Sequence, residues 1–190
     1  MDENICYILY GVIHEIKAKK VLEIGCGYAN MLMRLAKECP DTKFFGIDKE
    51  QLQINIARQI REQEKLSTVF LECIPYENYN GFVKLFDVVY IHSTIQYLED
   101  VDHFVGWTKR ALKPDGVVLV THVPLKRPKK ADKKQKIHNI TSEWIIKKFN
   151  DRGFDLMDMM DLKDRINLLF IDRVRFSKNR FILEHAEVDL

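Results

Sequence analysis

The sequence alternates short apolar runs with longer amphipathic stretches between residues 20 and 123, and this alternation constrains the fold more than any other feature. Short apolar runs are typical of strands buried in a parallel sheet, whereas apolar residues spaced three and four apart are typical of helices that cover one. The expected strands are 21–24, 43–47, 69–71, 87–91 and 117–120, and the expected helices are 3–18, 29–38, 49–65 and 97–112. The pattern predicts an α/β fold with a mainly parallel sheet and helices on both faces.

The last third of the chain follows the same alternation less regularly. The expected elements there are a helix over 142–151, a sixth strand over 154–160 and a seventh strand at Phe181-Ile182-Leu183. Thr141 or Ser142 is the expected N-cap of that helix. Residues 163–179 carry mixed signals and receive no assignment. A length of 190 residues suits one domain, so we expect a single domain with seven strands over 1–190.

Composition and charge narrow the class of protein. The 30 Lys and Arg residues nearly balance the 28 Asp and Glu residues, so the surface as a whole is not suited to binding a polyanion. No apolar run approaches the roughly 18 residues that cross a membrane, and the acidic start Met1-Asp2-Glu3 is unlike a secretory signal. The four cysteines show neither paired spacing nor a metal-ligand pattern. We therefore expect a cytoplasmic protein with reduced thiols, no membrane partner and no metal site.

The strongest local motif is Val-Leu-Glu-Ile-Gly-Cys-Gly-Tyr-Ala-Asn at residues 21–30, where an expected strand runs through two glycines into a helix. Gly25 and Gly27 permit unusual backbone angles and close approach of a ligand, and the helix N-terminus offers free N–H groups. Asp48 ends the next strand, about 20 residues later, where a carboxylate can accept hydrogen bonds from a ribose diol. Structural roles are the alternative: the glycines could form only the turn, and Asp48 could cap the helix over 49–65.

Two classes of cofactor share this geometry, and spacing separates them. A dinucleotide fingerprint requires a small residue at position 30, where this chain has Asn30, so an NAD-linked oxidoreductase is disfavoured. The small residue is instead Ala29, and Glu23 precedes the first glycine by two positions. This arrangement resembles motif I of the class I S-adenosylmethionine-dependent methyltransferases.

Three further segments resemble motifs of the same family in the expected order. They are FFGIDKE at 44–50, FDVVYIHSTIQYLED at 86–100 and LKPDGVVLVTH at 112–122. The resemblance implies a Rossmann-like seven-stranded sheet that binds S-adenosylmethionine and releases S-adenosylhomocysteine. It also divides the single domain into an N-terminal helix (1–18), a cofactor-binding core (20–123) and an acceptor-side loop, helix and final strands (124–190).

The resemblance implies roles for five residues near the glycines. The backbone of Gly25, Cys26 and Gly27 would approach the methionine part of the cofactor. Glu23 would anchor this loop and the amino-acid end of the cofactor, and Asp48 would bind the ribose hydroxyl groups.

Three further residues are implied at the adenine end of the cofactor. Lys49 or its neighbour would flank the adenine ring. Members of the family usually have a Gly-Asp pair after the third strand, and the acid of that pair contacts the adenine amine. This chain has Glu72-Cys73 there, so Glu72 and Cys73 are the expected counterparts.

Methyl transfer depends mainly on positioning, with a base where the acceptor must lose a proton. His92, which follows the fourth expected strand, is the candidate base because imidazole titrates near neutral pH. His122 is a second candidate, and Tyr97 is a candidate aromatic wall. A purely structural, hydrogen-bonded role is the alternative for His92.

The residues after the fourth strand narrow the class of acceptor. Residues 91–94 carry neither the Asp/Asn-Pro-Pro-Tyr/Phe nor the Pro-Cys motif of the adenine and cytosine methyltransferases, so we expect transfer to an O or N atom of a small-molecule acceptor. The basic run 126–136 would attract an acidic acceptor or RNA, or would form only a solvated loop. The alternatives are an RNA or nucleotide methyltransferase that uses this run, and a non-catalytic partner subunit with the same fold. No feature of the sequence predicts the oligomeric state.

Overall fold

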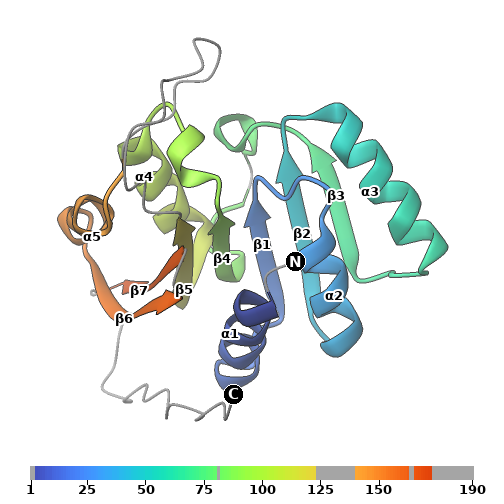
Figure 1. Cartoon of the computed structure of the whole chain (residues 1–190), viewed down its shortest axis with the longest axis horizontal. Coiled ribbons are helices and arrows are strands. Elements are labelled where there is room, and N and C mark those ends of the chain that lie inside the picture. Colours follow the sequence, from blue (N-terminus) through green and yellow to red (C-terminus); the bar gives the residue numbers. More distant parts are fainter. Residues whose placement is uncertain (1–2, 81, 123–139, 163–164, 173–190) are drawn as a thin grey trace.

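The computed structural model describes residues 3–80, 82–122, 140–162 and 165–172, and these form three layers with a seven-stranded sheet in the middle (Figure 1). The strands are β1 (Lys20–Ile24), β2 (Lys43–Asp48), β3 (Val69–Cys73), β4 (Phe86–His92), β5 (Leu112–His122), β6 (Phe154–Leu162) and β7 (Arg165–Asp172). Their order across the sheet is β3-β2-β1-β4-β5-β7-β6, and every neighbouring pair is parallel except the two that include β7. This confirms the expected α/β fold with a mainly parallel sheet.

Helices cover both faces of the sheet. On one face lie α1 (Glu3–Glu15), α2 (Asn30–Glu38) and α3 (Gln51–Gln63), and on the other lie α4 (Val101–Ala111) and α5 (Ser142–Asp151). Successive residues of β1 alternate between the two cores: Val21 packs beneath α1–α3, whereas Leu22 and Ile24 pack on the side of α4 and α5. Both faces of the central strands are therefore buried, as their continuous apolar runs predict. No described helix combines the length and the apolarity that crossing a membrane requires.

The seventh strand of the described sheet has no counterpart among the expected strands. It is β7, within the stretch 163–179 that received no assignment, and Phe181-Ile182-Leu183 lies outside the described residues. β7 lies between β5 and β6 and is antiparallel to both, so one of its two partners is distant in sequence. Residues 168–171 are all buried because they alternate between the two cores. Because β7 is buried on both faces, its sequence lacks the alternation of apolar and polar residues that marks a half-buried strand.

Side-chain caps set the starts of the two helices on one face. α4 begins later than the expected 97–112 because the Asp100 carboxylate accepts a hydrogen bond from the His103 N–H at 2.8 Å. α5 begins after Thr141, whose hydroxyl oxygen accepts a hydrogen bond from the Trp144 N–H at 3.2 Å. The expectation that position 141 or 142 caps this helix is confirmed at Thr141.

Asp87 of β4 joins three strands at the amino-terminal edge of the sheet. Its carboxylate accepts hydrogen bonds from the backbone N–H groups of Lys19 at 2.9 Å and Lys20 at 2.8 Å, and from the Lys113 ammonium group at 2.7 Å. Lys113 lies near the start of β5, where the pairing of β5 with β4 is irregular. One carboxylate therefore fixes β1, β4 and β5 relative to one another.

β3 forms one edge of the sheet, and an arginine covers part of it. The Arg58 guanidinium group of α3 donates to the Leu71 carbonyl oxygen of β3, at 3.0 Å from Nη2 and 3.4 Å from Nε. Phe70 of the same strand stacks on Phe45 of β2 with ring centroids 5.0 Å apart. A carbonyl group of this edge strand is thus bound by a side chain of its own domain.

Candidate functional site

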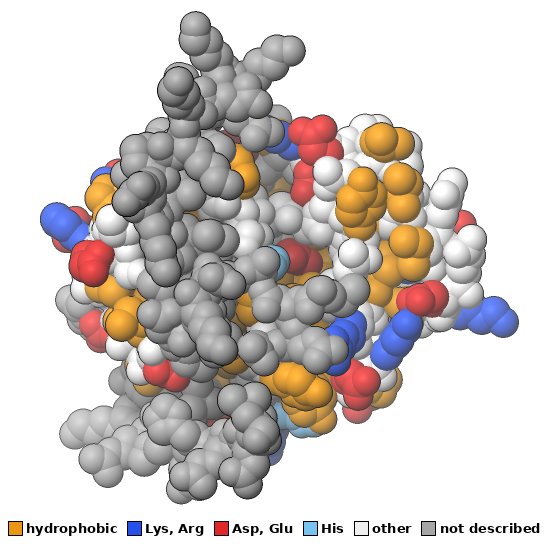
Figure 2. Space-filling model, viewed as in Figure 1, with side chains coloured by type: hydrophobic (Ala, Val, Ile, Leu, Met, Phe, Trp, Pro, Cys, Tyr) orange, Lys and Arg blue, Asp and Glu red, His pale blue; other side chains and the backbone are white. Residues whose placement is uncertain are grey.

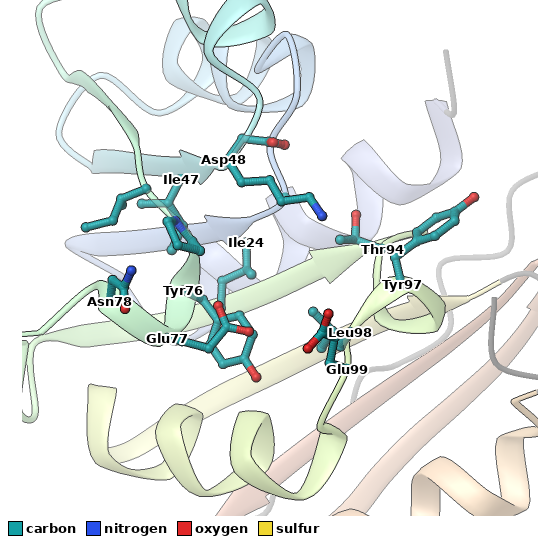
Figure 3. A pocket seen from close by; sticks show the side chains of 14 residues that line it. Ile24, Ile47, Asp48, Tyr76, Glu77, Asn78, Thr94, Tyr97, Leu98 and Glu99 are labelled. Carbon is teal, nitrogen blue, oxygen red and sulfur yellow. The ribbon is translucent and has the colours of Figure 1, made fainter. Parts of the chain in front are cut away.

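The order of the strands reverses between β1 and β4, and in open α/β sheets ligands bind at the carboxyl ends of the strands at this point. A cavity of about 410 Å³ lies there (Figure 3). Its lining comes from the ends of β1 and β2 (24–25 and 47–49), from residues 74–78 after β3, and from Thr94 and residues 97–99 after β4. The volume is in the range that small ligands and cofactors occupy.

The loop between β1 and α2 is held in a tight, repeated backbone geometry. Gly25, Gly27 and Ala29 have φ angles of +71°, +55° and +55°. The N–H groups of Gly25 and Cys26 both donate to the Ile47 carbonyl oxygen, at 2.9 and 3.1 Å, so the loop folds over the end of β2. No side chain caps α2 in the described structure, which leaves N–H groups of its first turn for a ligand.

Gly25 is required by space as well as by its backbone angle. A Cβ atom at this position would lie 2.4 Å from Thr94 Cγ2 and 2.7 Å from Thr94 Oγ1. The Thr94 hydroxyl group donates to the His92 carbonyl oxygen at 2.9 Å, which fixes its side chain against the glycine. The turn after β4 therefore packs directly on the glycine loop.

Asp48, the last residue of β2, ties the glycine loop to the start of α3. Its Oδ2 accepts a hydrogen bond from the Gly27 N–H at 2.8 Å, and its Oδ1 accepts one from the Glu50 N–H at 2.9 Å. Asp48 therefore has the structural role that the sequence analysis gave as the alternative, at the start of the helix that follows it. Each carboxylate oxygen can accept a second hydrogen bond, and Asp48 lines the cavity, so a ribose diol can also bind to it.

Glu23 lies beneath the loop and is 4% exposed. The Tyr90 hydroxyl group donates to Glu23 Oε2 at 2.8 Å. Burial raises the pKa of Glu23 from 4.5 to about 8; the hydrogen bond from Tyr90 opposes this rise and the nearby Asp48 charge adds to it. Burial also raises the pKa of the Cys26 thiol. A cation bound near Glu23 would favour the ionised form of its carboxyl group.

A glycine that the sequence analysis did not single out makes room for Cys26. A Cβ atom at Gly46 of β2 would lie 2.6 Å from Leu32 Cδ1, 2.9 Å from the Cys26 sulfur and 2.9 Å from Leu71 Cδ2. Gly46 therefore lets α2 and the glycine loop approach the sheet. Its position inside an expected strand was the only signal of this role.

The residues expected at the adenine end divide into two groups. Lys49 lines the cavity. Cys73 pairs with Asp48 across β2 and β3 and directs its thiol at the Lys49 carbonyl oxygen at 3.6 Å, and Glu72 is exposed. Neither Glu72 nor Cys73 is among the described residues that line the cavity, which β3 reaches instead through residues 74–78.

Tyr76 is a buried lining residue that sequence reasoning missed. It begins the short 3-10 helix η1 (Tyr76–Asn78), is buried, and donates from its hydroxyl group to the Asp100 carbonyl oxygen at 3.2 Å. Burial raises its pKa above the usual value for tyrosine. The Pro75 that precedes it was the only sequence signal of a turn entering the cavity.

His92 is the last residue of β4 and pairs with Thr121 of β5, and it is not among the described residues that line the cavity. His122, the second candidate base, is 1% exposed. Its Nε2 atom lies 3.0 Å from Ser142 Oγ, and this contact joins β5 to α5. Tyr97 ends the 3-10 helix η2 (Ile95–Tyr97), lines the cavity and is 44% exposed. The basic run 126–136 lies outside the described residues.

The charges around the cavity suit a cationic ligand. Asp48, Glu77 and Glu99 line it together with Lys49, and Figure 3 shows Asp48 and Glu99 on opposite sides. Apolar side chains, among them those of Ile24, Ile47, Ile74 and Leu98, supply the apolar part of the lining. These residues fit S-adenosylmethionine, which combines a cationic sulfur with a ribose diol and an adenine ring.

The fold and this site define a Rossmann-like α/β domain that holds a nucleotide cofactor at the carboxyl ends of its strands. More narrowly, the chain belongs to the methyltransferase-domain family, because the model of that family, described as "Methyltransferase domain", matches residues 15–174. The family and the fold class expected from the sequence are thereby confirmed.

Individual relatives share parts of the chain. A ubiquinone biosynthesis O-methyltransferase from Acinetobacter baylyi is 26% identical over 109 residues, which are 57% of this chain and 45% of that protein. A tRNA (guanine-N(7)-)-methyltransferase from Aquifex aeolicus is 34% identical over 92 residues, which are 47% of this chain and 30% of that protein. The match therefore spans less than half the length of these curated relatives.

A solved structure matches over almost its full length. The crystal structure of a SAM dependent methyltransferase from Aquifex aeolicus superimposes with a TM-score of 0.71 at 18% identity, over 90% of this chain and 99% of that one. At this identity the likeness establishes the fold.

Proposed function

We propose that the chain binds S-adenosylmethionine in this cavity and transfers the methyl group to an O or N atom of a small acceptor molecule. The observation that carries the proposal is the hydrogen bond that joins the glycine loop to Asp48 at the 410 Å³ cavity, where the strand order reverses. When bound, S-adenosylmethionine supplies a methyl group on a cationic sulfur that an oxygen or nitrogen nucleophile can displace.

The chain contributes mainly by positioning. The left-handed backbone at Gly25 and Gly27 lets a ligand approach the loop closely, and Asp48 offers its remaining lone pairs to the ribose. Glu77 and Glu99 favour a cation in the cavity. Holding two reactants in the right geometry supplies much of the rate of such a displacement.

The acceptor site is proposed on the side of the turn that follows β4. Thr94 and Tyr97 line the cavity there, and His92 ends the strand that precedes them. We assign His92 as the base for acceptors that must lose a proton on methylation.

The described residues on one face give no support to a surface that binds RNA. On the face that Figure 2 shows, the described Lys and Arg side chains are interspersed with Asp and Glu and form no continuous basic surface. A phosphate backbone is bound by clustered basic side chains. The names of the relatives include both ubiquinone biosynthesis and tRNA, so RNA is kept as the second candidate.

Calorimetric titration with S-adenosylhomocysteine tests the cofactor site. We expect one site in the wild type and affinity about 10- to 100-fold weaker in Asp48→Ala, because hydrogen bonds to a charged group contribute about 1.5–3 kcal/mol. Asp41→Ala removes an exposed aspartate that does not line this cavity, and it should bind as the wild type does. A folded wild type that gives neither heat nor a thermal shift would overturn the proposal.

The acceptor is tested separately once binding is established. Formation of S-adenosylhomocysteine is measured with panels of phenols, carboxylates and amines, and turnover with one class identifies the acceptor. Binding to bulk RNA with a steep dependence on salt would favour the RNA alternative. Elution from a sizing column only as a complex, with no turnover on any acceptor, would favour a partner subunit.

A further inference from the structure

Tyr76 connects two segments of the cavity lining that are distant in the sequence. One is the segment 74–78 after β3, the other is the segment 97–99 after β4, and Figure 3 shows their labelled side chains on opposite sides of the cavity. The Tyr76 side chain is buried, and its hydroxyl group donates to the Asp100 carbonyl oxygen at 3.2 Å. Because Asp100 directly follows the second segment, this hydrogen bond ties the two sides of the cavity together.

The Asp100 carbonyl oxygen that binds Tyr76 also begins helix α4. It accepts a hydrogen bond from the Phe104 N–H at 3.1 Å, while the Asp100 carboxylate accepts one from the His103 N–H at 2.8 Å. The Tyr76 ring meets the rings of Phe104 and Trp107 edge-on, with centroids 5.5 and 5.9 Å apart. Tyr76 therefore contacts the first two turns of α4 as well as the cavity.

His103 holds the Tyr76 hydroxyl group from a second side. Its Nδ1 atom lies 3.4 Å from the Tyr76 hydroxyl oxygen. A carbonyl oxygen can only accept, so the hydroxyl proton is used in the bond to Asp100, and a hydrogen bond from His103 requires a proton on Nδ1. With a partner on each side, the hydroxyl group is fixed in one orientation at the start of α4.

We propose that Tyr76 is a positioning residue for the ligand of this cavity: its hydroxyl group holds residues 97–99 in place through Asp100, and a ligand in the cavity in turn orders the first turn of α4. The inference rests on the proposed function, since the ligand is the one proposed above. It adds a link between the cavity and α4, none of whose residues is among the described lining.

Preorganisation is the reason that this hydroxyl group should affect binding. Residues 97–99 join the short helix η2 to α4, and Leu98 and Glu99 belong to neither. A connecting segment that becomes ordered only when the ligand arrives loses conformational entropy at that moment, and the affinity falls accordingly. A hydrogen bond that fixes the segment beforehand removes part of this cost.

Calorimetric titration with S-adenosylhomocysteine measures the effect on binding. Tyr76→Phe keeps the ring and removes the hydroxyl group, and it should bind about fivefold more weakly than the wild type, as loss of one hydrogen bond predicts. Leu98→Ala should weaken binding about fivefold in the wild type but less than about twofold in Tyr76→Phe, because the segment that carries Leu98 is no longer held there. Equal factors in both backgrounds would overturn the inference.

Tyr79→Phe is the matched control from the same connection between β3 and β4. Tyr79 is also buried, and it contacts Trp107 of α4 through its ring and its carbonyl oxygen, neither of which uses its hydroxyl group. It is not among the described residues that line the cavity, so Tyr79→Phe should bind as the wild type does. Wild-type affinity in Tyr76→Phe would overturn the inference and leave the proposed function intact, whereas absence of binding to the wild type would overturn both.

Hydrogen exchange followed by mass spectrometry tests the link to α4 directly. In the wild type, saturating S-adenosylhomocysteine should slow exchange of the amides of His103 and Phe104 at least about fivefold. In saturated Tyr76→Phe the ligand should still slow exchange in the glycine loop, but not at these two amides. Slowing at both places in Tyr76→Phe contradicts the inference. If Tyr76→Phe does not fold, the wild type alone decides, because exchange at the start of α4 that the ligand leaves unchanged also contradicts it.

Discussion

Replacement of Gly25 by alanine tests whether the glycine loop needs both its backbone angle and its space. An alanine at φ +71° costs about 1–2 kcal/mol. Its Cβ atom would lie 2.4 Å from Thr94 Cγ2, and relief of such overlap costs about 1–3 kcal/mol. Gly25→Ala should therefore destabilise the protein by about 3 kcal/mol.

A second substitution separates the two effects. Thr94→Ala removes both overlapping atoms and leaves a Cβ atom 3.0 Å from the new one, at the cost of about 1 kcal/mol for the hydrogen bond to the His92 carbonyl oxygen. The backbone cost remains in the double variant, but the overlap is largely gone. The loss of unfolding free energy in the double variant should be about 1–2 kcal/mol smaller than the sum of the losses in the two single variants.

Urea unfolding of the four proteins gives these energies, provided that the slopes with denaturant agree. Gly11→Ala is the control, because a Cβ atom at that position of α1 meets nothing within 4 Å. It should leave stability unchanged or raise it by up to about 1 kcal/mol. If the changes in unfolding free energy of Gly25→Ala and Thr94→Ala add to within about 0.3 kcal/mol, overlap with Thr94 is not a cause of the destabilisation by Gly25→Ala.

Three further changes have defined outcomes. Because the pKa of Glu23 is raised, the folded state binds more protons than the unfolded state between pH 4.5 and about 8. The free energy of unfolding of the wild type should therefore fall as the pH rises over this range, by up to about 1.4 kcal/mol per pH unit relative to Glu23→Gln. Urea unfolding of both proteins at pH 5, 6.5 and 8 checks this. Asp87→Ala removes the acceptor of three hydrogen bonds and should destabilise by about 2–3 kcal/mol, with Asp87→Asn intermediate, in the same assay. His92→Asn should slow methylation of a phenol about 100-fold, measured as formation of S-adenosylhomocysteine, and should slow methylation of an unprotonated tertiary amine far less.

The sequence was sufficient for the features that depend on neighbouring residues. The apolar runs predicted the central strands, and the glycine spacing located the loop whose left-handed angles the structure shows at Gly25 and Gly27. Asp48 was expected at the end of β2, and it lines the cavity there. In each case the signal lies within one strand and the turn after it.

The missed features depend on contacts between distant residues. The Tyr90–Glu23 hydrogen bond joins residues 67 positions apart, and β7 is defined by its insertion between two other strands. The family resemblance pointed to Glu72 and Cys73 for the adenine end, whereas the described cavity lining after β3 comes from residues 74–78. Periodicity reports which face of an element is buried, but not which element covers that face.

The guanidinium group of Arg58, which reaches from α3 to the edge strand β3, bears on the tendency of this domain to aggregate. An exposed edge strand is a template on which another chain can add a strand and begin to aggregate. An incoming strand at Leu71 would have to displace two N–H donors from the carbonyl oxygen that it needs. Arg58 therefore acts as a gatekeeper against intermolecular β-pairing along this edge.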